Sequence, residues 1–470
     1  MKKYIKTLII LSSMGIVIGC KVSKDIETPL PEFPAAFRNA EVNDNEAIAD
    51  IPWKDFYKDP VLQKLIDSAI IRNYDMQIAL KNVEQSQLQL RQSRWNNVPI
   101  VAFNATSSTS NPSDNSLNGL STKQFLGTNH IEDFNANLNL SWEADIWGKI
   151  RSKNKAALAV YLKTEEARKT IQTDLVAKVT QGYYNLLMLD QQLSVTQRNV
   201  LLNDSTLKII NMQFQTGHVT SLAVQQAQAQ LLSTQQLIPE LEENITIQEN
   251  ALRILSGELP ATVQRSTLLA QVIFPETLSA GLPSALLSRR PDIKSRELEL
   301  VLANAKVGVS KAEMYPALRI TASAGVNSLK ASNWFNIPAS LFGIVGGSVL
   351  QPLLQRRELR TQYKVDLVER EKAVLLFRES VLKAVGEVSD ALVKIEKLKV
   401  REAIAADRVK TLQQATSNAN DLFTNGMATY LEVITAQGNV LQSELELASI
   451  KRLELSAISE LYRSLGGGIK

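Results

Sequence analysis

A fifteen-residue pattern occurs twice in this sequence, and this duplication limits the possible folds more than any other feature. The stretch FQTGHVTSLAVQQAQ begins at Phe214, and FTNGMATYLEVITAQ begins 209 residues later at Phe423. A period of this length far exceeds the roughly 20–50 residues of a solenoid repeat, so it indicates duplication of a whole half-protein. We therefore predict two copies of one large, helix-rich module. The seven positions that match without a gap are Phe214/Phe423, Gly217/Gly426, Thr220/Thr429, Leu222/Leu431, Val224/Val433, Ala227/Ala436 and Gln228/Gln437.

The two copies are predicted to cover 60–257 and 278–467, with 258–277 as the linker between them. Their register follows from Asp75, which recurs as an aspartate 217 residues later. By the fifteen-residue pattern this offset has fallen to 209, so the first copy contains the longer insertion. The segment 107–133 accounts for it. This segment is rich in Ser, Asn, Thr and Gly and has no helical period, so we expect an exposed loop there.

Residues 1–19 are predicted to be a secretory signal peptide. They begin with a basic region of three lysines and continue through an apolar run that is too short for a comfortable transmembrane helix. Cys20 is the only cysteine in the sequence and directly follows a glycine, an arrangement that resembles a bacterial lipobox. We predict acylation of Cys20 and a lipid-anchored segment over 20–59; a plain signal peptide with an incidental cysteine is the alternative. Lys21 is not the aspartate associated with inner-membrane retention, so we expect an outer-membrane destination.

Two very long helices are predicted, one in each copy. Residues 150–214 contain no proline and one glycine, and a helix of that length would span about 100 Å. The second copy has a comparable run over 358–423. Apolar residues recur every seven positions in the first run, which favours coiled-coil packing. These positions are Val179, Leu186, Leu193, Val200, Leu207 and Phe214.

Each long helix is expected to turn back on itself at the duplicated glycine. Gly217 and Gly426 can adopt the left-handed conformation that ends a helix, and the threonine that follows each of them offers an N-cap for the next helix. Thr429 and Glu432 fit a capping box, T-x-x-E. The predicted product is an antiparallel helical hairpin in each copy, over 150–255 and 358–465, with returning helices over 222–255 and 431–465.

Four short segments have the alternation of β-strands. Residues 134–142 read FNANLNLSW, which places apolar side chains on one face and three asparagines and a serine on the other. Residues 318–326 repeat this pattern, and 98–107 and 342–350 are weaker partners. Such alternation fits a strand between lipid and a water-filled lumen, although a half-buried strand of a soluble sandwich could also alternate. No segment has 18 consecutive apolar residues, so a membrane crossing would require a barrel. Closed membrane barrels have at least about eight strands, so several chains would have to contribute.

The sequence resembles the TolC-like outer-membrane efflux channels, specifically the lipidated type that serves resistance-nodulation-division pumps. This resemblance covers nearly the whole mature chain. It implies a mainly α-helical homotrimer in which four strands per chain form a shared 12-stranded β-barrel, continuous with a trimeric α-barrel of long coiled-coil helices. The motifs that support it are the duplicated F-x-x-G-x-x-[TS]-x-L-x-V-x-x-A-Q, SWEADIWGKIR at Ser141–Arg151, RRPDI at Arg289–Ile293, KAEMYP at Lys311–Pro316 and QPLL at Gln351–Leu354.

The resemblance also implies partners and site residues. The hairpin tips would lie in the periplasm, where an adaptor protein joins the channel to an inner-membrane pump. Glu432 falls where relatives have an acidic residue facing the lumen, and three copies would form a ring that selects for cations. Thr435 occupies the place of a second acid in some relatives. Glu432 could equally serve only in the capping box. The residues implied for the tip and adaptor docking are Phe214, Gly217, Thr220, Leu222, Phe423, Gly426, Thr429 and Leu431.

The junction between the strand at 134–142 and the first long helix is expected to be structural. Trp142, Asp145, Trp147 and Arg151 mark this junction at the inner face of the bilayer, and a role in the turn is favoured over contact with a ligand. At the corresponding place in the second copy, Gln355-Arg356-Arg357 departs from the family, which usually has an acid followed by glycines. A tighter or more charged turn is expected there.

Other classes of function fit the sequence less well. The net charge is +4, and the part after the signal peptide carries +1 without a Lys/Arg cluster, which argues against nucleic acid. No nucleophile elbow, zinc motif or phosphate loop is present, so we expect no enzyme and no cofactor. His130 and His218 fall in the presumed outer loop and at a tip, so they do not predict a metal site. A coiled-coil adaptor or structural lipoprotein without a pore is the alternative, but an adaptor would have a single hairpin.

Overall fold

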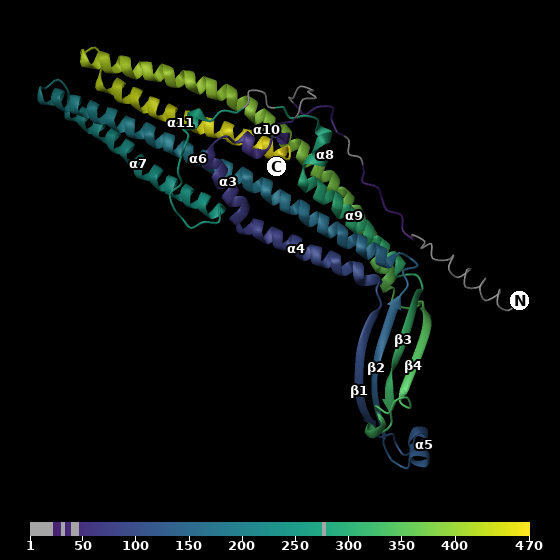
Figure 1. The fold of residues 1–470 in the computed structure, drawn as a ribbon. Helices are drawn as coiled ribbons and strands as arrows, with labels where there is room; N and C mark the ends of the chain where they lie inside the picture. The colour runs from purple at the N-terminus through teal and green to yellow at the C-terminus, as the bar shows by residue number, and fades with distance from the viewer. Residues whose placement is uncertain (1–21, 30–32, 39–46, 275–278) are drawn as a thin grey trace. The chain divides into compact units, whose positions relative to one another are not determined.

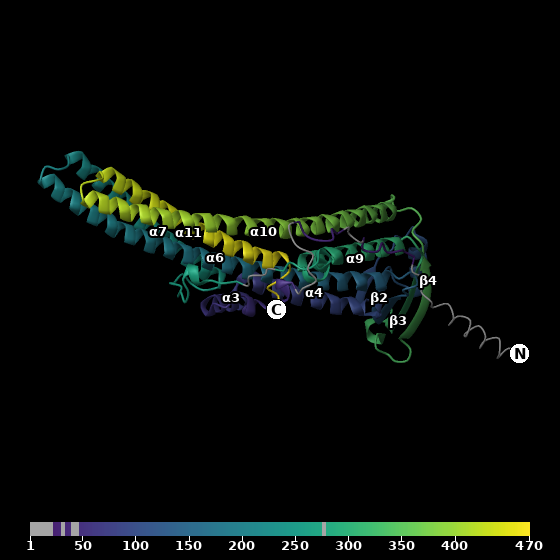
Figure 2. The ribbon, with the colours of Figure 1, turned by 90° about the horizontal axis from the view of Figure 1, so that it is seen from above.

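The computed structural model describes residues 22–29, 33–38, 47–274 and 279–470. Cys20 and the predicted signal peptide lie outside the described residues. The chain divides into two compact units (Figures 1 and 2). The sheet unit comprises the described residues up to Pro29 together with Gln85–Leu162 and Glu297–Leu375, and the hairpin unit comprises those of Leu30–Glu84, Lys163–Arg296 and Leu376–Lys470.

The sheet unit contains one antiparallel sheet with the strand order β1-β2-β3-β4 (Figure 1). Because the side chains of a strand alternate between faces, residues paired across strands share a face. Leu138 pairs with Phe103 on one side and Ala324 on the other, and Ala324 pairs with Gly343. Most apolar side chains of β1, β2 and β3 therefore lie on the same face. Strand β4 is apolar on both faces, because Phe342 and Ile344 lie on the side of Asn137 and Asn139. The strands are β1 (Ile100–Ser110), β2 (Ile131–Glu143), β3 (Ala317–Ser328) and β4 (Leu341–Leu350).

The expected loop over 107–133 is wrong in part, because it contains the helix α5 (Leu117–Leu126) and the ends of two strands. The Ser116 hydroxyl accepts a hydrogen bond from the Gly119 N–H at 3.0 Å, which caps the start of α5. Gly127 ends the helix with a φ of 68°. A helix of ten residues shows too little periodicity to be recognised, and here its capping residues specify it.

The hairpins follow the predicted boundaries to within about one residue. In the first copy α6 (Lys149–Gln215) is followed by α7 (Ser221–Leu255), and in the second copy α10 (Glu358–Thr424) is followed by α11 (Tyr430–Ser464). Figures 1 and 2 show the four helices running side by side toward the two turns. The other helices of more than three residues are α2 (Trp53–Phe56), α3 (Pro60–Arg72), α4 (Tyr74–Arg94), α8 (Leu286–Arg289) and α9 (Pro291–Ala312).

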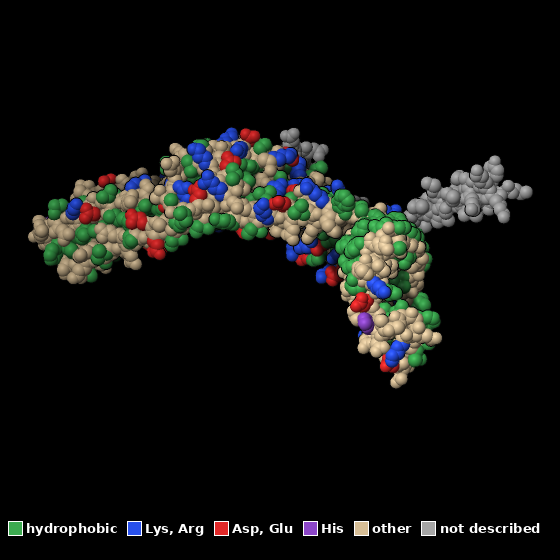
Figure 3. Space-filling model, turned by 60° about the horizontal axis from the view of Figure 1, so that its bottom comes forward, with side chains coloured by type: hydrophobic (Ala, Val, Ile, Leu, Met, Phe, Trp, Pro, Cys, Tyr) green, Lys and Arg blue, Asp and Glu red, His purple; other side chains and the backbone are tan. Residues whose placement is uncertain are grey.

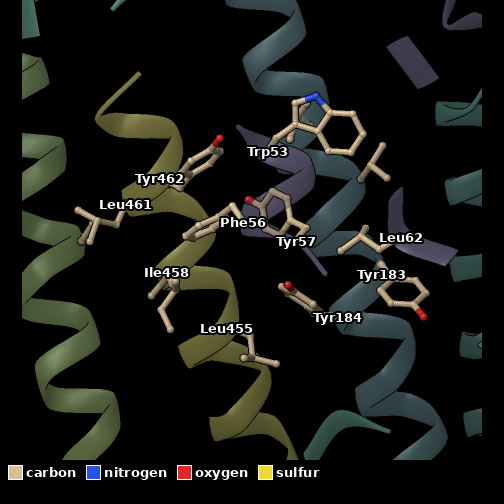
Figure 4. Close-up of a cluster of buried hydrophobic side chains, with 14 of the residues drawn as sticks. Trp53, Phe56, Tyr57, Leu62, Tyr183, Tyr184, Leu455, Ile458, Leu461 and Tyr462 are labelled. Carbon is tan, nitrogen blue, oxygen red and sulfur yellow. The ribbon is translucent and has the colours of Figure 1, made fainter. Parts of the chain in front are cut away.

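The core of the hairpin unit is an aromatic cluster that joins both copies (Figure 4). Phe56 stacks on Tyr462 with ring centroids 4.2 Å apart, and Tyr57 meets the edge of Phe56. The Tyr57 hydroxyl donates to the Ser459 hydroxyl at 3.3 Å, so this buried polar group is satisfied. Tyr183 and Tyr184 extend the cluster onto α6. The segment before α3 thus packs against helices from both halves of the duplication.

The predicted seven-residue seam of α6 is most fully buried near this core. Val179 and Leu186 are fully buried, whereas Phe214 at the tip is 45% exposed. Toward the tip some of the buried positions are polar: the Asn203 side chain donates to the Thr234 hydroxyl of α7 at 2.9 Å. A straight α-helix drifts by about 20° per heptad, so one apolar phase cannot face the same neighbour along the whole helix. In the last third of α6 the seam residues Leu193, Val200 and Leu207 are half-buried, and Leu207 packs against the cluster near the tips, so the seam continues there less completely buried.

Candidate functional site

Both hairpin tips are closed by a Schellman motif. At the first tip the Gly217 N–H donates to the Phe214 carbonyl at 3.0 Å, and the next N–H donates to the Gln213 carbonyl at 2.9 Å. The second tip repeats these bonds, with Gly426 donating to the Phe423 carbonyl at 3.1 Å. The two glycines have φ values of 78° and 73°, which explains why both copies have glycine here.

The matched apolar residues of the tips differ in exposure. Leu222 and Leu431 are 54% and 53% exposed, so each tip presents a leucine at the start of its returning helix. Phe214 is also exposed, but its counterpart Phe423 is only 4% exposed. Phe423 packs in a small cluster with Ile210, Ala223, Ala227 and Val433, which holds the two hairpins together. The accessible apolar surface of the tips therefore does not include Phe423.

Glu432 completes the predicted capping box of α11. Its carboxylate accepts a hydrogen bond from the Thr429 N–H at 2.6 Å and from the Thr429 hydroxyl at 3.3 Å. The side chain of Glu432 nevertheless remains exposed, as does Thr435 one turn further on. In the first copy the matched residue is Ala223, which is fully buried, and Thr220 occupies the N-cap without a side-chain hydrogen bond. The tips therefore share a turn and differ in charge.

Two hydrogen bonds between the hairpins were not anticipated from the sequence. The Tyr430 hydroxyl donates to the Gln226 side chain at 2.6 Å, and the Gln437 amide donates to the Thr206 hydroxyl at 2.8 Å. Three of these four residues lie inside the duplicated pattern, but a comparison of the two copies highlights identical positions. Tyr430 and Gln226 are at positions that differ between the copies, so the repeat gave no signal for them.

The sheet has an apolar face and a face that is lined by amides along β2 and by Phe342 and Ile344 along β4. Along β2 the Asn139 amide donates to Asn137, and the Asn137 amide donates to Asn135, each at 2.9 Å. On the opposite face large apolar side chains are exposed, with Phe103 at 70% and Val345 at 82%. Figure 3 shows hydrophobic side chains gathered over the sheet. The outer strands β1 and β4 each pair with only one neighbour, so both edges of this sheet are open.

The residues predicted at the strand-to-helix junction have structural roles. The Trp142 indole N–H donates to the Asn97 carbonyl at 2.9 Å, and the Trp147 indole N–H donates to the Pro316 carbonyl at 2.8 Å. The Asp145 carboxylate accepts from the N–H groups of Ile150 and Arg151 at 2.8 and 3.0 Å, so it caps the start of α6. These bonds fix the path of the chain from β2 into α6.

The described residues give no sign of a metal centre. No group of three or more His, Cys, Asp or Glu side chains among them is arranged to hold a metal ion. His130 lies 3.9 Å from Glu132 in the sheet unit, and the ring of His218 contacts the Thr216 hydroxyl at its tip. Within the same residues, none of the helices has the length and apolar character needed to cross a membrane.

Comparison with known proteins gives consistent matches over most of the chain. The family model described as outer membrane efflux protein matches residues 65–258 and 282–467. The chain is similar to the probable outer membrane lipoprotein SilC of Salmonella typhimurium, with 24% identity over 98% of both chains. It is 28% identical to the solvent efflux pump outer membrane protein SrpC of Pseudomonas putida over 96% of both. The open-state structure of the MtrE outer membrane channel of Neisseria gonorrhoeae superposes with a TM-score of 0.86 and 25% identity, covering 96% of this chain and 99% of that one.

Proposed function

Because the chain belongs to the outer membrane efflux protein family, we propose that it forms the outer-membrane exit duct of a tripartite efflux system. An inner-membrane pump of the resistance-nodulation-division type drives the substrate, and a periplasmic adaptor joins that pump to the duct. The duct itself is passive, and we expect no enzymatic activity. The observation that supports this proposal best is the sheet register, which gathers most apolar side chains of β1, β2 and β3 on one face and the amides of β2 on the other. Such a sheet suits lipid on one side and water on the other.

The proposed assembly is a homotrimer. A single chain provides four strands with two open edges, and closed membrane barrels have at least about eight strands. If β1 of one copy pairs with β4 of the next, three copies close a barrel of twelve strands and no edge remains. The amide ladder of β2 then faces the lumen, and Phe103 and Val345 face the lipid.

The adaptor is proposed to bind at the hairpin tips. The exposed leucines Leu222 and Leu431 give each tip an apolar contact, and the turns at Gly217 and Gly426 repeat with the same geometry. A partner that recognises one tip can therefore recognise the other in a related way. Phe423 supports this surface from beneath, because it packs between the hairpins.

Glu432 is proposed to combine two roles. Its carboxylate caps α11 through the Thr429 N–H, and its exposed position allows three copies to form an acidic ring. In recordings of the trimer in a planar bilayer, Glu432→Ala should lower the preference for cations, with a smaller shift in reversal potential across a salt gradient. Thr435→Ala is the matched control and should leave the reversal potential unchanged. An unchanged value for Glu432→Ala would leave only the capping role.

Cys20 is proposed to carry the lipid anchor of the mature protein. The similarity to a relative described as a probable outer membrane lipoprotein supports this proposal. Intact-mass measurement of the purified protein should show acylation at the N-terminal cysteine, and a Cys20→Ser variant should be secreted without the added mass. An unmodified N-terminus in the wild-type protein would refute the anchor and leave the duct proposal standing.

The efflux role itself has a direct cellular test. Deletion of the gene should sensitise cells to compounds exported by the cognate pump, and a plasmid copy should restore resistance. Unchanged susceptibility across a broad panel of amphiphiles, solvents and metal ions would count against an efflux role. The adaptor alternative does not fit the fold, because each of the two hairpins follows its own pair of strands in the chain.

A further inference from the structure

The described residues nearest the N-terminus, 22–29, lie against the helices of the sheet unit, and one side chain fixes their register. The Asn304 side chain of α9 accepts a hydrogen bond from the Ile26 N–H at 3.0 Å and donates one to the Ile26 carbonyl at 2.8 Å. Asn304 is 5% exposed, so a buried amide binds both backbone groups of a single residue. An amide offers one acceptor and two donors, and this pairing is the one that a neighbouring strand would provide.

Contacts on either side hold the same segment to two further helices. Lys155 of α6 forms an ion pair with Asp25 at 2.6 Å, and Arg370 of α10 donates to the Lys24 carbonyl at 3.3 Å. The segment therefore contacts helices from both copies of the duplication. We call residues 22–29 the strap.

Gly308 allows the strap to approach α9 closely. It lies four residues after Asn304, on the same side of the helix. A Cβ atom at this position would come within 3.2 Å of the Ser23 hydroxyl and 2.7 Å of the Ser152 hydroxyl. Ser23 itself is 7% exposed, so the strap enters a slot beside α9 at this residue, while Lys24, Ile26 and Glu27 remain exposed.

The slot belongs to the second copy alone. At the offset of 217 that relates the two copies here, Asn304 corresponds to Gln87 and Gly308 corresponds to Arg91. Gly308 leaves space beside α9, whereas the first copy has the long side chain of Arg91 at the equivalent position and therefore no such space. The duplicated fold does not require this slot, which indicates a separate purpose for it.

We propose that Asn304 is a positioning residue that docks the strap and thereby fixes where the lipid anchor leaves the protein. This inference rests on the proposed acylation of Cys20. Cys20 is two residues before Val22, so at most about 7 Å of chain separates the anchor from the strap. A docked strap gives the acyl chains a fixed point of entry into the membrane. If residues 20–59 were a flexible segment instead, the position of the acyl chains would vary over tens of ångströms.

The test uses trypsin on the full-length, membrane-extracted trimer, because Lys24 is a cleavage site within the strap. Release of the acylated N-terminal peptide is followed by mass spectrometry. Asn304→Ala should speed this release at least tenfold relative to the wild-type protein. Gln87→Ala is the matched control, since it removes an amide at the equivalent position of the first copy, and it should release the peptide at the wild-type rate.

Gly308→Ala provides a second variant that does not threaten the helix, because alanine is a better helix former than glycine. It should also speed release, by crowding Ser23. Equal release from the wild-type protein and Asn304→Ala would overturn the docking, and so would equal acceleration by Gln87→Ala. Cys20→Ser, which lacks the acylation site but keeps Asn304, tests the docking of the strap apart from the anchor. A protected strap without acylation in the wild-type protein would refute the anchor, whereas an acylated but unprotected strap would refute the role of Asn304.

Discussion

The starts of α4 and α9 occupy equivalent places in the two copies, and they meet the same structural need with different chemistry. Asn73 donates to the Leu255 carbonyl at 3.0 Å, and Arg290 donates to the Ser464 carbonyl at 3.1 Å. Each bond ties the end of the returning helix, α7 or α11, to the start of α4 or α9 in the same copy. The duplication has thus kept the carbonyl that is bound and has changed the group that binds it.

The second copy adds a network of charges around this bond. Arg290, with a side chain 5% exposed, pairs with Asp292 at 2.7 Å and Glu387 at 2.8 Å. Arg463 continues the network to Glu387 at 3.4 Å and to Asp174 of the first copy at 3.2 Å. In the first copy the Asn73 side chain instead accepts from the Met76 N–H at 3.2 Å, without a charge. The hydrogen bond to the end of the returning helix is therefore made by a neutral side chain in the first copy and by a charged one in the second.

The largest expected difference between the copies comes from removing these two side chains. Arg290→Ala removes a buried guanidinium from two carboxylates, those of Asp292 and Glu387, whose side chains are 39% and 40% exposed. Water can solvate these carboxylates, so the expected cost is about 3 kcal/mol, the low end for breaking a buried pair. Asn73→Ala removes neutral hydrogen bonds and should cost about 1–3 kcal/mol. Thermal unfolding of the detergent-solubilised variants measures both. Equal losses of stability in the two variants would show that the charges of the second copy do not contribute to stability.

Acidification should weaken the charged contact of the second copy and leave the neutral contact of the first copy unchanged. Burial alone would raise the pKa of Asp292, but the hydrogen bond and charge of Arg290 outweigh it and hold this pKa below its usual value. The stabilisation is therefore present above the unfolded-state pKa of about 3.9 and is lost as the pH falls through the folded-state value. The melting temperature should fall below about pH 4 in the wild-type protein and in Asn73→Ala. In Asp292→Asn this part of the pH dependence should be absent, and its persistence would contradict the assignment to Asp292.

The tips offer a smaller contrast. Glu432→Ala removes the capping box of α11, and loss of a cap costs about 0.5–2 kcal/mol of local stability. Hydrogen exchange of the amides in the first turn of α11 should speed up. The first turn of α7, which has Ala223 at the matched place, serves as an internal reference and should not change. Faster exchange at both tips would point to a general loosening of the hairpins.

The smallest effect is expected at the two strand-to-helix turns. The turn into α6 has Gly148 with a φ of 75°, whereas the turn into α10 places Arg356 and Arg357 at φ values of 46° and 65°. A left-handed conformation costs a residue other than glycine about 1–2 kcal/mol, and the greater entropy that glycine loses on folding offsets about 0.5–1 kcal/mol of this difference. Arg357→Gly should therefore raise the melting temperature slightly, and Gly148→Ala should lower it. A loss of stability in Arg357→Gly would show that the arginine side chain makes a compensating contact.

The sequence predicted the long elements well because their signals are local. The tip glycines and the N-cap threonines end and start helices within a few residues, and the alternation along β2 and β3 needs only one strand to be recognised. Helix α5 was missed because Ser116 and Gly127 specify it without a periodic pattern.

Long-range chemistry was not predictable in the same way. Arg290 and Glu387 are 97 residues apart, and Asn304 meets Ile26 across 278 residues. No spacing rule relates such pairs, so the charge network and the strap slot emerge only from the fold. At the tips, the sequence predicted the turns and the cap of Glu432, but the burial of Phe423 and the bond between Tyr430 and Gln226 depend on how the two hairpins pack together.

The central claim is that three copies close one duct with the apolar face of the sheet in the membrane. Single-particle electron microscopy of the detergent-purified protein tests this claim most directly. We predict a threefold-symmetric particle with a detergent belt around the strands and long helices extending from it. A monomer, or a particle without a detergent belt, would contradict the account, because the open edges of β1 and β4 and the exposed apolar face of the sheet would then have no partner.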